Sequence, residues 1–344
     1  MKTTQFHLEN DIMKDYNQNI KVRSKGMGTR NVRTKKYISS NDKFADLCNY
    51  FLFDGKSVIQ PNDLKEKDVT ELGIPYTDKG YMALEKIRDL LKSCIVKTAA
   101  GVTYLVIGIE NQTDIHYAMV IRDMLMDALN YATQVDTYAK MHRKDKDLKG
   151  DEFLSGFAKT DKLQPVITIT VYWGSGAWDG ARCLHEMLDV PDKELLRFIS
   201  NYKMNLIVPD EITDFNKFQT ELGTVFEICQ CANDKEKFLN LVESRRKEGF
   251  FLGREAVEML NECVNVGIKL PEAKGDVVDM CKAVEDLKNE FKAEGKAEGR
   301  AEGELRMLIS LVTDGIISIQ TAASKACMTE AEFEKCMESI TKVL

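Results

Sequence analysis

Apolar and polar positions alternate along the first half of the chain in blocks that predict helices and strands in turn. Apolar residues at positions 44, 47, 48 and 51 keep the spacing of one helix face, and Ser40, Asn41 and Asp42 are suitable N-caps before them. We therefore expect a first helix over residues 42–53. Residues 54–75 predict a loop with short irregular structure, and residues 84–96 lead into a strand.

The centre of the predicted fold is the run VTYLVIGIE, residues 102–110. It is almost uniformly apolar and rich in β-branched residues, a pattern typical of a strand covered on both faces. The preceding TAAG, residues 98–101, predicts a turn. A long helix is expected over residues 116–142. We expect its apolar side chains to form a broad inward face consisting of Met119, Leu125, Ala128, Leu129, Ala132 and Val135.

Two further apolar runs, residues 165–173 and 204–209, predict strands, and helical periodicity dominates from residue 214 to 287. This order of elements predicts an α/β fold with a mixed central sheet and helices on its faces. No run of eighteen apolar residues occurs and residues 1–10 lack an apolar core, so neither a membrane span nor a secretion signal is expected.

The segment KAEGKAEGRAEG, residues 292–303, repeats every four residues. Each glycine lowers helix propensity by roughly 1 kcal/mol relative to alanine, and opposite charges fall two residues apart, so pair support should be absent. The segment is therefore either a charged linker or a smooth helix surface on which a second copy packs. Residues 305–344 predict a small helical module, with Thr329 and Glu332 as a capping box. We favour oligomerisation or partner binding for it over DNA reading.

The net charge of −7 argues against a uniformly basic surface, and nine scattered cysteines favour reduced thiols in the cytoplasm. Residues 21–36 nevertheless carry seven lysines or arginines and no acid. They predict a flexible basic arm, which is either a solubilising tail or a grip on a nucleic-acid backbone. The arm residues that we expect to contact DNA are Lys21, Arg23, Lys25, Arg30, Arg33, Lys35 and Lys36.

Acidic residues flank the predicted hairpin at both ends. Asp89 precedes its first strand and Glu110 ends its second, so an antiparallel pairing would place the two carboxylates side by side. Hard cations such as Mg²⁺ or Mn²⁺ prefer carboxylate and carbonyl oxygens, and the backbone carbonyl of Asn111 would supply a third. Gln112 emerges on the same strand face as Glu110 and could orient water or hold a phosphate oxygen. Acids at strand ends also occur without a metal.

Several longer stretches resemble the recombination-promoting nucleases, a transposase-related family of the PD-(D/E)XK nuclease superfamily. The resemblance runs from about Asp42 to Asp286, and it includes the glutamate-glycine repeat. It is carried by DKFADLCNYFLFDG, RDLLKS, YLVIGIENQTDIHYAMVIRDMLMDALNY, EFLSGF, PVITITVYWG and WDGARCLHEML. It implies a nuclease-like α/β core and metal-dependent DNA endonuclease activity linked to recombination.

By this resemblance Asp89, Glu110 and Gln112 occupy the catalytic positions. Gln112 stands where the superfamily generally has lysine, although the recombination-promoting group is similar in having glutamine. The loss of that positive charge predicts weak activity. Arg122 and Tyr131 lie on the following helix, where nuclease-like folds often contact phosphate. Asp46, on the first helix, is a further candidate that would reach the metal through water.

The sequence therefore predicts a Mg²⁺- or Mn²⁺-dependent DNA endonuclease that forms a dimer through its C-terminal helices. The predicted segments are a basic arm (1–38), a nuclease-like domain (39–250), a helical extension with the repeat (251–304) and a helical module (305–344). The alternatives are a catalytically silent DNA-binding or assembly protein, and a transposase that also joins strands.

Overall fold

The computed structural model describes residues 32–67, 70–73, 76–77, 80–81, 84–87, 89–98, 101–174, 176–270, 275 and 277–341. The chain divides into two compact units, Met1–Val278 and Asp279–Leu344. The unit boundary lies at Val278, so the segment 251–278 belongs with the sheet-containing unit. Among the described helices, none combines the length and apolar character that a membrane span requires.

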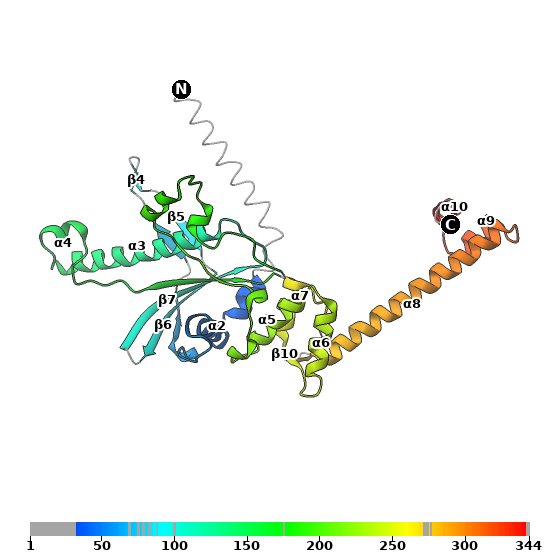
Figure 1. Ribbon diagram of the computed structural model, residues 1–344, viewed down its shortest axis with the longest axis horizontal. Helices are drawn as coiled ribbons and strands as arrows, with labels where there is room; N and C mark the ends of the chain where they lie inside the picture. Colours follow the sequence, from blue (N-terminus) through cyan, green and yellow to red (C-terminus); the bar gives the residue numbers. More distant parts are fainter. Residues whose placement is uncertain are drawn as a thin grey trace, which may run out of the picture. The chain divides into compact units, whose positions relative to one another are not determined.

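A mixed sheet forms the centre of the first unit (Figure 1). Within the described residues its strand order is β1-β6-β7-β8-β9. The strands are β1 (Leu64–Glu66), β6 (Leu90–Thr98), β7 (Gly101–Gln112), β8 (Val166–Tyr172) and β9 (Asn205–Ile207). β1, β6 and β7 pair antiparallel, whereas β8 runs parallel to β7 and β9 parallel to β8. The expected α/β fold with a mixed central sheet and flanking helices is confirmed.

Helices cover both faces of this sheet, as the alternation of side chains along β6 shows. Leu91 packs with Val106, Val166 and Tyr131 of the helix α3 (Met119–Asp145), so it marks the α3 face. The next residue, Lys92, points to the other face, where its Nζ atom donates to the carbonyl of Ser39 just before α2 (Asn41–Phe53). β7 is buried from Leu105 onward, but residues 101–104 are exposed. The expectation that this strand is covered on both faces throughout is therefore wrong at its start.

The helix α2 matches the predicted first helix to within one residue. It ends at Phe53, and the next residue, Asp54, adopts the left-handed conformation at φ 55°. The following segment differs from the predicted loop, because it contains the 3-10 helix η1 (Pro61–Asp63) and the edge strand β1. Between β1 and β6 two small antiparallel pairs form, β2 (Thr70–Gly73) with β5 (Leu84–Ile87) and β3 (Tyr76–Thr77) with β4 (Gly80–Tyr81). These strands are too short for periodicity to reveal.

The buried face of α3 is more polar than its sequence predicts. Asp123, Asp127 and Asn130 are buried, whereas Ala128 and Ala132 of the expected apolar face are exposed. Hydroxyl groups of the sheet satisfy the acids: Thr170 Oγ1 donates to Asp123 Oδ2 at 2.7 Å and Thr168 Oγ1 donates to Asp127 Oδ1 at 2.5 Å. The predicted inward face is thus wrong in part, because the buried stripe is rotated toward these acids.

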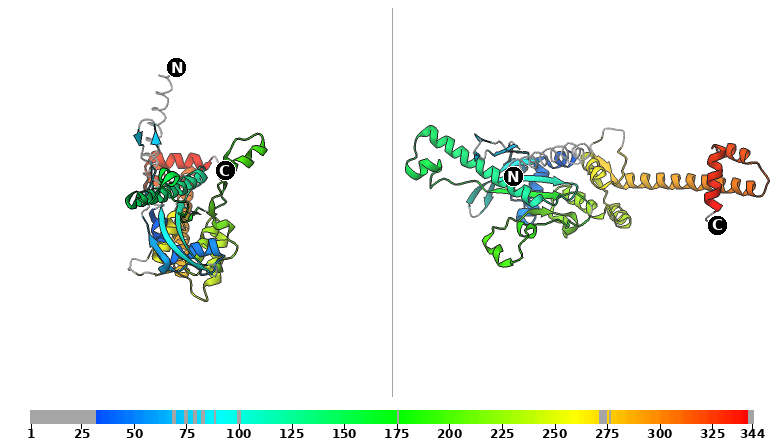
Figure 2. Two further views of the ribbon diagram at one scale, coloured as in Figure 1. Left: turned by 90° about the vertical axis from the view of Figure 1, so that its left-hand side faces the viewer. Right: turned by 90° about the horizontal axis from the view of Figure 1, so that it is seen from above.

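The far end of α3 continues past the sheet and folds back through α4 (Gly150–Ser155) (Figures 1 and 2). His142 fastens this turn, since its Nδ1 atom contacts the Asp147 carboxylate and its Nε2 atom the Asp161 carboxylate, each at 2.9 Å. Gly156, at φ 67°, approaches so closely that an added Cβ would lie 2.8 Å from the Cβ of Ala139. We call residues 139–161 the α3–α4 tip.

The tip should become less stable as the pH rises. Hydrogen bonds to Asp147 and Asp161 raise the pKa of His142 above its ordinary value, so the folded state favours the imidazolium. This contribution is complete below the unfolded pKa of about 6.5 and is lost as the pH rises through the higher folded pKa. We expect hydrogen exchange in residues 139–161, corrected for intrinsic rates, to show lower protection at alkaline than at acidic pH. His142→Ala should remove this dependence, and an unchanged dependence would contradict the assignment.

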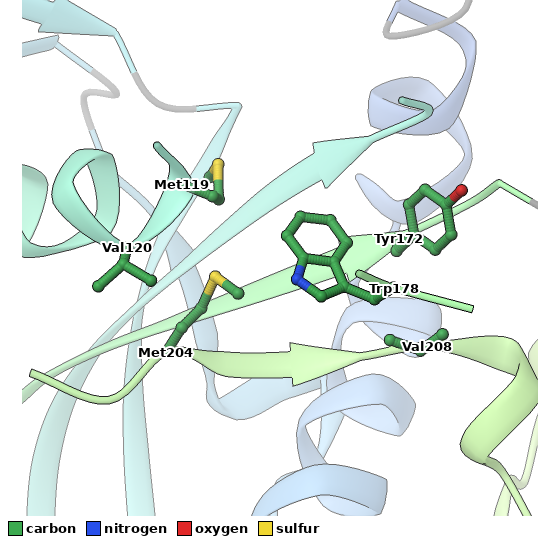
Figure 3. Close-up of a cluster of buried hydrophobic side chains, with 6 residues drawn as sticks. All are labelled: Met119, Val120, Tyr172, Trp178, Met204 and Val208. Carbon is green, nitrogen blue, oxygen red and sulfur yellow. The ribbon is translucent and has the colours of Figure 1, made fainter. Parts of the chain in front are cut away.

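A long connection between β8 and β9 holds the start of α3. It contains η2 (Leu184–Met187) and η3 (Lys193–Phe198). Six buried side chains form a hydrophobic cluster here, with the indole of Trp178 among them (Figure 3). The Nε1 atom of Trp178 donates to the carbonyl of Gly180 at 2.9 Å. The cluster brings the beginning of α3 and the ends of β8 and β9 together through Met119, Val120, Tyr172, Trp178, Met204 and Val208. Through Trp178, the connection after β8 therefore covers this end of the sheet.

Helices complete the first unit beyond β9. Two short 3-10 turns, η4 (Pro209–Glu211) and η5 (Phe215–Lys217), precede α5 (Leu222–Cys231), α6 (Lys235–Arg245) and α7 (Arg254–Val264). The short strands β10 (Phe251–Gly253) and β11 (Val277–Asp279) pair within this expected helical region. The aromatic ring of Phe226 on α5 stacks on Trp173 at 5.0 Å between centroids, which packs α5 against the end of β8.

Residues 32–38 form a helix, so the expected flexible arm is wrong for its described end. Thr34, Tyr37 and Ile38 are buried, and the ring of Tyr37 meets Trp173 edge-on at 6.3 Å. Burial of these side chains supplies the stabilisation that the glycine-, serine- and threonine-rich sequence before them lacks.

The second unit consists of α8 (Met280–Thr313), α9 (Ile319–Lys325) and α10 (Glu330–Thr341). The repeat lies within α8, and an added Cβ at Gly299 or Gly303 would meet no atom within 4 Å. Arg300 and Glu304 form an i,i+4 ion pair at 3.2 Å, so the expected absence of pair support is wrong at the end of the repeat. The capping box is confirmed, because Thr329 N donates to Glu332 Oε2 and Glu332 N to Thr329 Oγ1.

Candidate metal and DNA site

The β6–β7 hairpin brings the two predicted metal ligands together. Leu90 pairs with Ile109, so continuing the register by one residue puts Asp89 opposite Glu110. Each carboxylate accepts a hydrogen bond from the other strand: Asp89 N donates to Glu110 Oε1 at 3.3 Å, and Asn111 N donates to Asp89 Oδ2 at 2.8 Å. The hairpin predicted from the sequence is confirmed, and it holds the two acids side by side at one end.

Burial makes the charge on these acids unfavourable unless it is compensated. Glu110 has no exposed surface, and Arg122 Nη2 lies 3.0 Å from its Oε2 atom. Burial raises the pKa of Asp89 above its ordinary value, while the Asn111 N–H group and the positive charges of Arg122 and Lys35 act in the opposite direction. The pair is therefore a place where an additional cation would be stabilised.

The residues after Glu110 divide between the two faces of the sheet. Gln112 shares the α3 face with Glu110, as expected from strand alternation, and is 8% exposed. Asn111 points to the opposite face, where its Oδ1 atom accepts a hydrogen bond from Trp173 Nε1 at 2.8 Å. The carbonyl of Gln112 also accepts from Trp173 N at 2.7 Å. Trp173 thus fixes the end of β7 that carries the site, a role that sequence reasoning missed.

Asp123 is a second residue near the site that sequence reasoning missed. Glu110 pairs with Thr170 across β7 and β8, and Thr170 donates its hydroxyl to the fully buried Asp123. Asp127 follows one turn later and accepts hydrogen bonds from Thr168 and from Tyr202, the latter at 2.7 Å. The spacing of two aspartates by four residues was the available signal. These bonds fix the rotation of α3 and therefore the position of Arg122.

Asp46 has a different environment from the one expected. It is buried, and its carboxylate accepts hydrogen bonds from Gln219 N at 2.9 Å, Thr220 N at 2.8 Å and Thr220 Oγ1 at 2.6 Å. These contacts tie α2 to the segment that begins α5. They account for the burial of its charge, and none of them connects Asp46 to Asp89 or Glu110.

Apart from Arg122, the predicted DNA-contacting residues divide into four groups. The Tyr131 hydroxyl accepts a hydrogen bond from Val166 N at 3.0 Å, so it is engaged at the start of β8. Arg33 pairs with Glu258 and Glu262, and Lys36 pairs with Glu255 at 2.8 Å. These arginine and lysine side chains are thus directed to α7. Lys35 is half-buried, and its charge acts on Asp89. Lys21, Arg23, Lys25 and Arg30 lie outside the described residues.

The donor chemistry of the acid pair fits a magnesium-type ion better than a transition metal held by several side chains. Among the residues that the structure describes, no group of three or more His, Cys, Asp or Glu side chains is arranged around one point. Mg²⁺ keeps most of its waters and is commonly held by one or two carboxylates together with substrate phosphate oxygens. Asp89 and Glu110 provide such a pair.

Comparisons of the chain with protein families, with curated proteins and with solved structures give no match.

Proposed function

We propose that this chain is a metal-dependent DNA endonuclease of the PD-(D/E)XK type, related to the recombination-promoting nucleases. The observation that carries the proposal is the cross-strand pairing of Asp89 and Glu110, in which each carboxylate accepts an N–H from the other strand. Buried acids in such proximity repel one another, so a fold that holds them together favours a site with a compensating cation.

Asp89 and Glu110 would hold a Mg²⁺ or Mn²⁺ ion, with the carbonyl of Asn111 as an expected third oxygen. Such an ion would lower the pKa of a bound water and offset the charge that develops on the phosphate. The chain itself fixes the two carboxylates through the hairpin register. Gln112, on the same face as Glu110, has an amide that can accept a hydrogen bond from the attacking water or donate one to a phosphate oxygen.

Arg122 supports binding of a phosphate. Its side chain is 37% exposed while it contacts Glu110, so the guanidinium lies between the buried acid and solvent. When a cation takes over the charge of Glu110, the guanidinium can form two parallel hydrogen bonds to a phosphodiester. A positive group from α3 would then compensate for the glutamine at position 112.

Supercoiled plasmid tests this proposal directly. The purified chain should convert it to nicked and linear forms with Mg²⁺ or Mn²⁺ and leave it intact in EDTA. A crystal soaked in Mn²⁺ provides a readout independent of turnover, because anomalous density should lie between Asp89 and Glu110. Absence of both cleavage and density would refute the proposal. Products in which strands are joined would extend the proposal to transposition.

We also propose the cytoplasm as the compartment, because the scattered cysteines of the sequence favour reduced thiols.

The runner-up is a catalytically silent DNA-binding or assembly protein with the same fold. The observation that favours it is the Arg122–Glu110 ion pair, because it balances the buried carboxylate without a metal. Such a protein would bind DNA equally well in EDTA and in Mg²⁺ and would not nick it.

Dimerisation through the C-terminal helices is also part of the proposal, because two sites are needed to cut both strands. The Gly-Ala stripe of α8 is exposed at Gly299 and Gly303, so a second helix can approach it closely. In size-exclusion chromatography, the full-length chain should elute as a dimer and a chain ending at Glu290 as a monomer. The first unit remains complete in this truncation. An unchanged oligomeric state would exclude α8 as the interface.

A further inference from the structure

The α3–α4 tip is a firmly built protrusion that the site does not use. His142 joins Asp147 and Asp161, and Lys159 N donates to Glu152 Oε1 at 2.8 Å. The ring of Phe157 packs edge-on against Tyr138 at 5.4 Å. Figure 1 and the right-hand view of Figure 2 show the tip extending beyond the sheet. Its surface therefore has a fixed shape.

Two large apolar side chains of this tip point into solvent. Phe153 is 66% exposed and Leu154 is 83% exposed. They border a pocket of about 510 Å³, which Ala139, Leu148, Arg143 and Lys146 also line. Covering a side chain of this size removes it from water and contributes about 1.5–3 kcal/mol. A rigid element that leaves both uncovered is suited to contact another molecule.

Positive charge surrounds these apolar side chains. Among the described residues, Arg143, Lys144, Lys146 and Lys149 form no ion pair. The acids of the tip are mostly engaged, since Asp147 and Asp161 contact His142 and Glu152 accepts the Lys159 N–H. Asp145 and Asp151 remain as exposed acids. Cations around an apolar centre favour a ligand that combines anionic and apolar groups.

The spacing along α3 favours a nucleic acid over an acidic peptide. Arg143 follows Arg122 by 21 residues (143 minus 122) on the same helix, which places it about 32 Å further along the axis and about 60° from the same angular position, so both lie toward one flank. One turn of B-DNA measures roughly 34–36 Å, so a duplex presents the same face at both points. An acidic peptide has no such repeat.

We propose that the α3–α4 tip is a second DNA contact, which binds backbone phosphates through Arg143 and Lys146 about one helical turn from the Asp89–Glu110 pair. Phe153 and Leu154 would press into the minor groove there, as apolar wedges do in other DNA-binding proteins. The choice of DNA as the ligand rests on the proposed function.

Binding of the full chain to a labelled, mixed-sequence duplex of about 30 base pairs tests this contact by fluorescence anisotropy. The titration is made in EDTA, so that its result does not depend on cleavage. Arg143→Ala combined with Lys146→Ala should weaken binding roughly tenfold and reduce the slope of log K against log salt by about 2. The matched control replaces Lys159 and Lys162, two exposed lysines of the same region outside the pocket, with alanine, and it should bind like wild type.

The apolar contact has its own signature. Phe153→Ala with Leu154→Ala should weaken binding while leaving the salt slope and the melting temperature unchanged, because both side chains are exposed in the free protein. Duplexes shorter than about one helical turn, roughly 10 base pairs, cannot reach both contacts and should lose affinity sharply. Equal affinity of the Arg143/Lys146 variant and its control, or no binding of the duplex by wild type, would overturn the proposal. Binding without cleavage in Mg²⁺ or Mn²⁺ would instead refute only the proposed nuclease activity.

Discussion

Asp89→Ala is expected to reduce metal-dependent plasmid nicking by at least about 100-fold, which corresponds to roughly 2.7 kcal/mol of activation free energy. The reason is that the hairpin register places the Asp89 carboxylate opposite Glu110, where each acid accepts an N–H from the other strand. If the two acids hold the proposed cation, the variant would lose both a negative charge and a direct ligand of that ion. The measurement is the initial rate of conversion of supercoiled plasmid in Mg²⁺ or Mn²⁺.

The control for this variant is Asp189→Ala, which removes an exposed acid of the connection between β8 and β9 and should cut like wild type. Asp89→Asn adds a second test, because its amide oxygen can still accept the N–H of Asn111 while its negative charge is lost. Equal cutting by wild type and both Asp89 variants would exclude this residue from the reaction.

Arg122→Ala is expected to destabilise the protein in EDTA by about 2–3 kcal/mol. The variant leaves the fully buried Glu110 carboxylate without its guanidinium partner. Breaking a buried ion pair commonly costs about 3–5 kcal/mol. The expected loss is smaller here because the Arg122 side chain is 37% exposed, so solvent screens its charge. At about 2–4 °C per kcal/mol, the melting temperature should fall by roughly 5–10 °C.

Added Mn²⁺ distinguishes a metal site from a purely structural ion pair. If the acids bind a cation, Mn²⁺ should raise the melting temperature of Arg122→Ala more than that of wild type, because the ion replaces the lost positive charge. Arg143→Ala, at an exposed arginine on the same helix, should melt like wild type in both buffers. Destabilisation by Arg122→Ala that Mn²⁺ leaves unchanged would contradict cation binding at Glu110.

The features that could be predicted from the sequence are those that a local pattern specifies. The apolar run before Glu110 predicts a buried strand, and the small turn residues before it predict its antiparallel partner, so the meeting of Asp89 and Glu110 follows from the register. The helix after Ser40 follows from its spacing and caps for the same reason.

The features that could not be predicted depend on partners distant in sequence. Asp123 and Asp127 resemble solvated acids until threonines some 40 residues later donate to them. Asp46 is buried because Gln219 and Thr220 supply its hydrogen bonds. The helix over residues 32–38 is stabilised by the packing of Tyr37 against Trp173. In each case a tertiary contact outweighs a local propensity, and single-sequence periodicity contains no information about it.

The continuity of α3 has a consequence for how such a chain can evolve. A single residue inserted between Asp127 and Lys140 would turn everything beyond it by about 100° and advance it by about 1.5 Å. The threonine contacts of Asp123 and Asp127 would hold the first half in place, so Arg122 would keep its position while the distal end faced another direction. Substitutions at exposed positions of this stretch, such as Ala128 and Ala132, leave the direction of the distal end unchanged, whereas changes of its length should be confined to about whole turns.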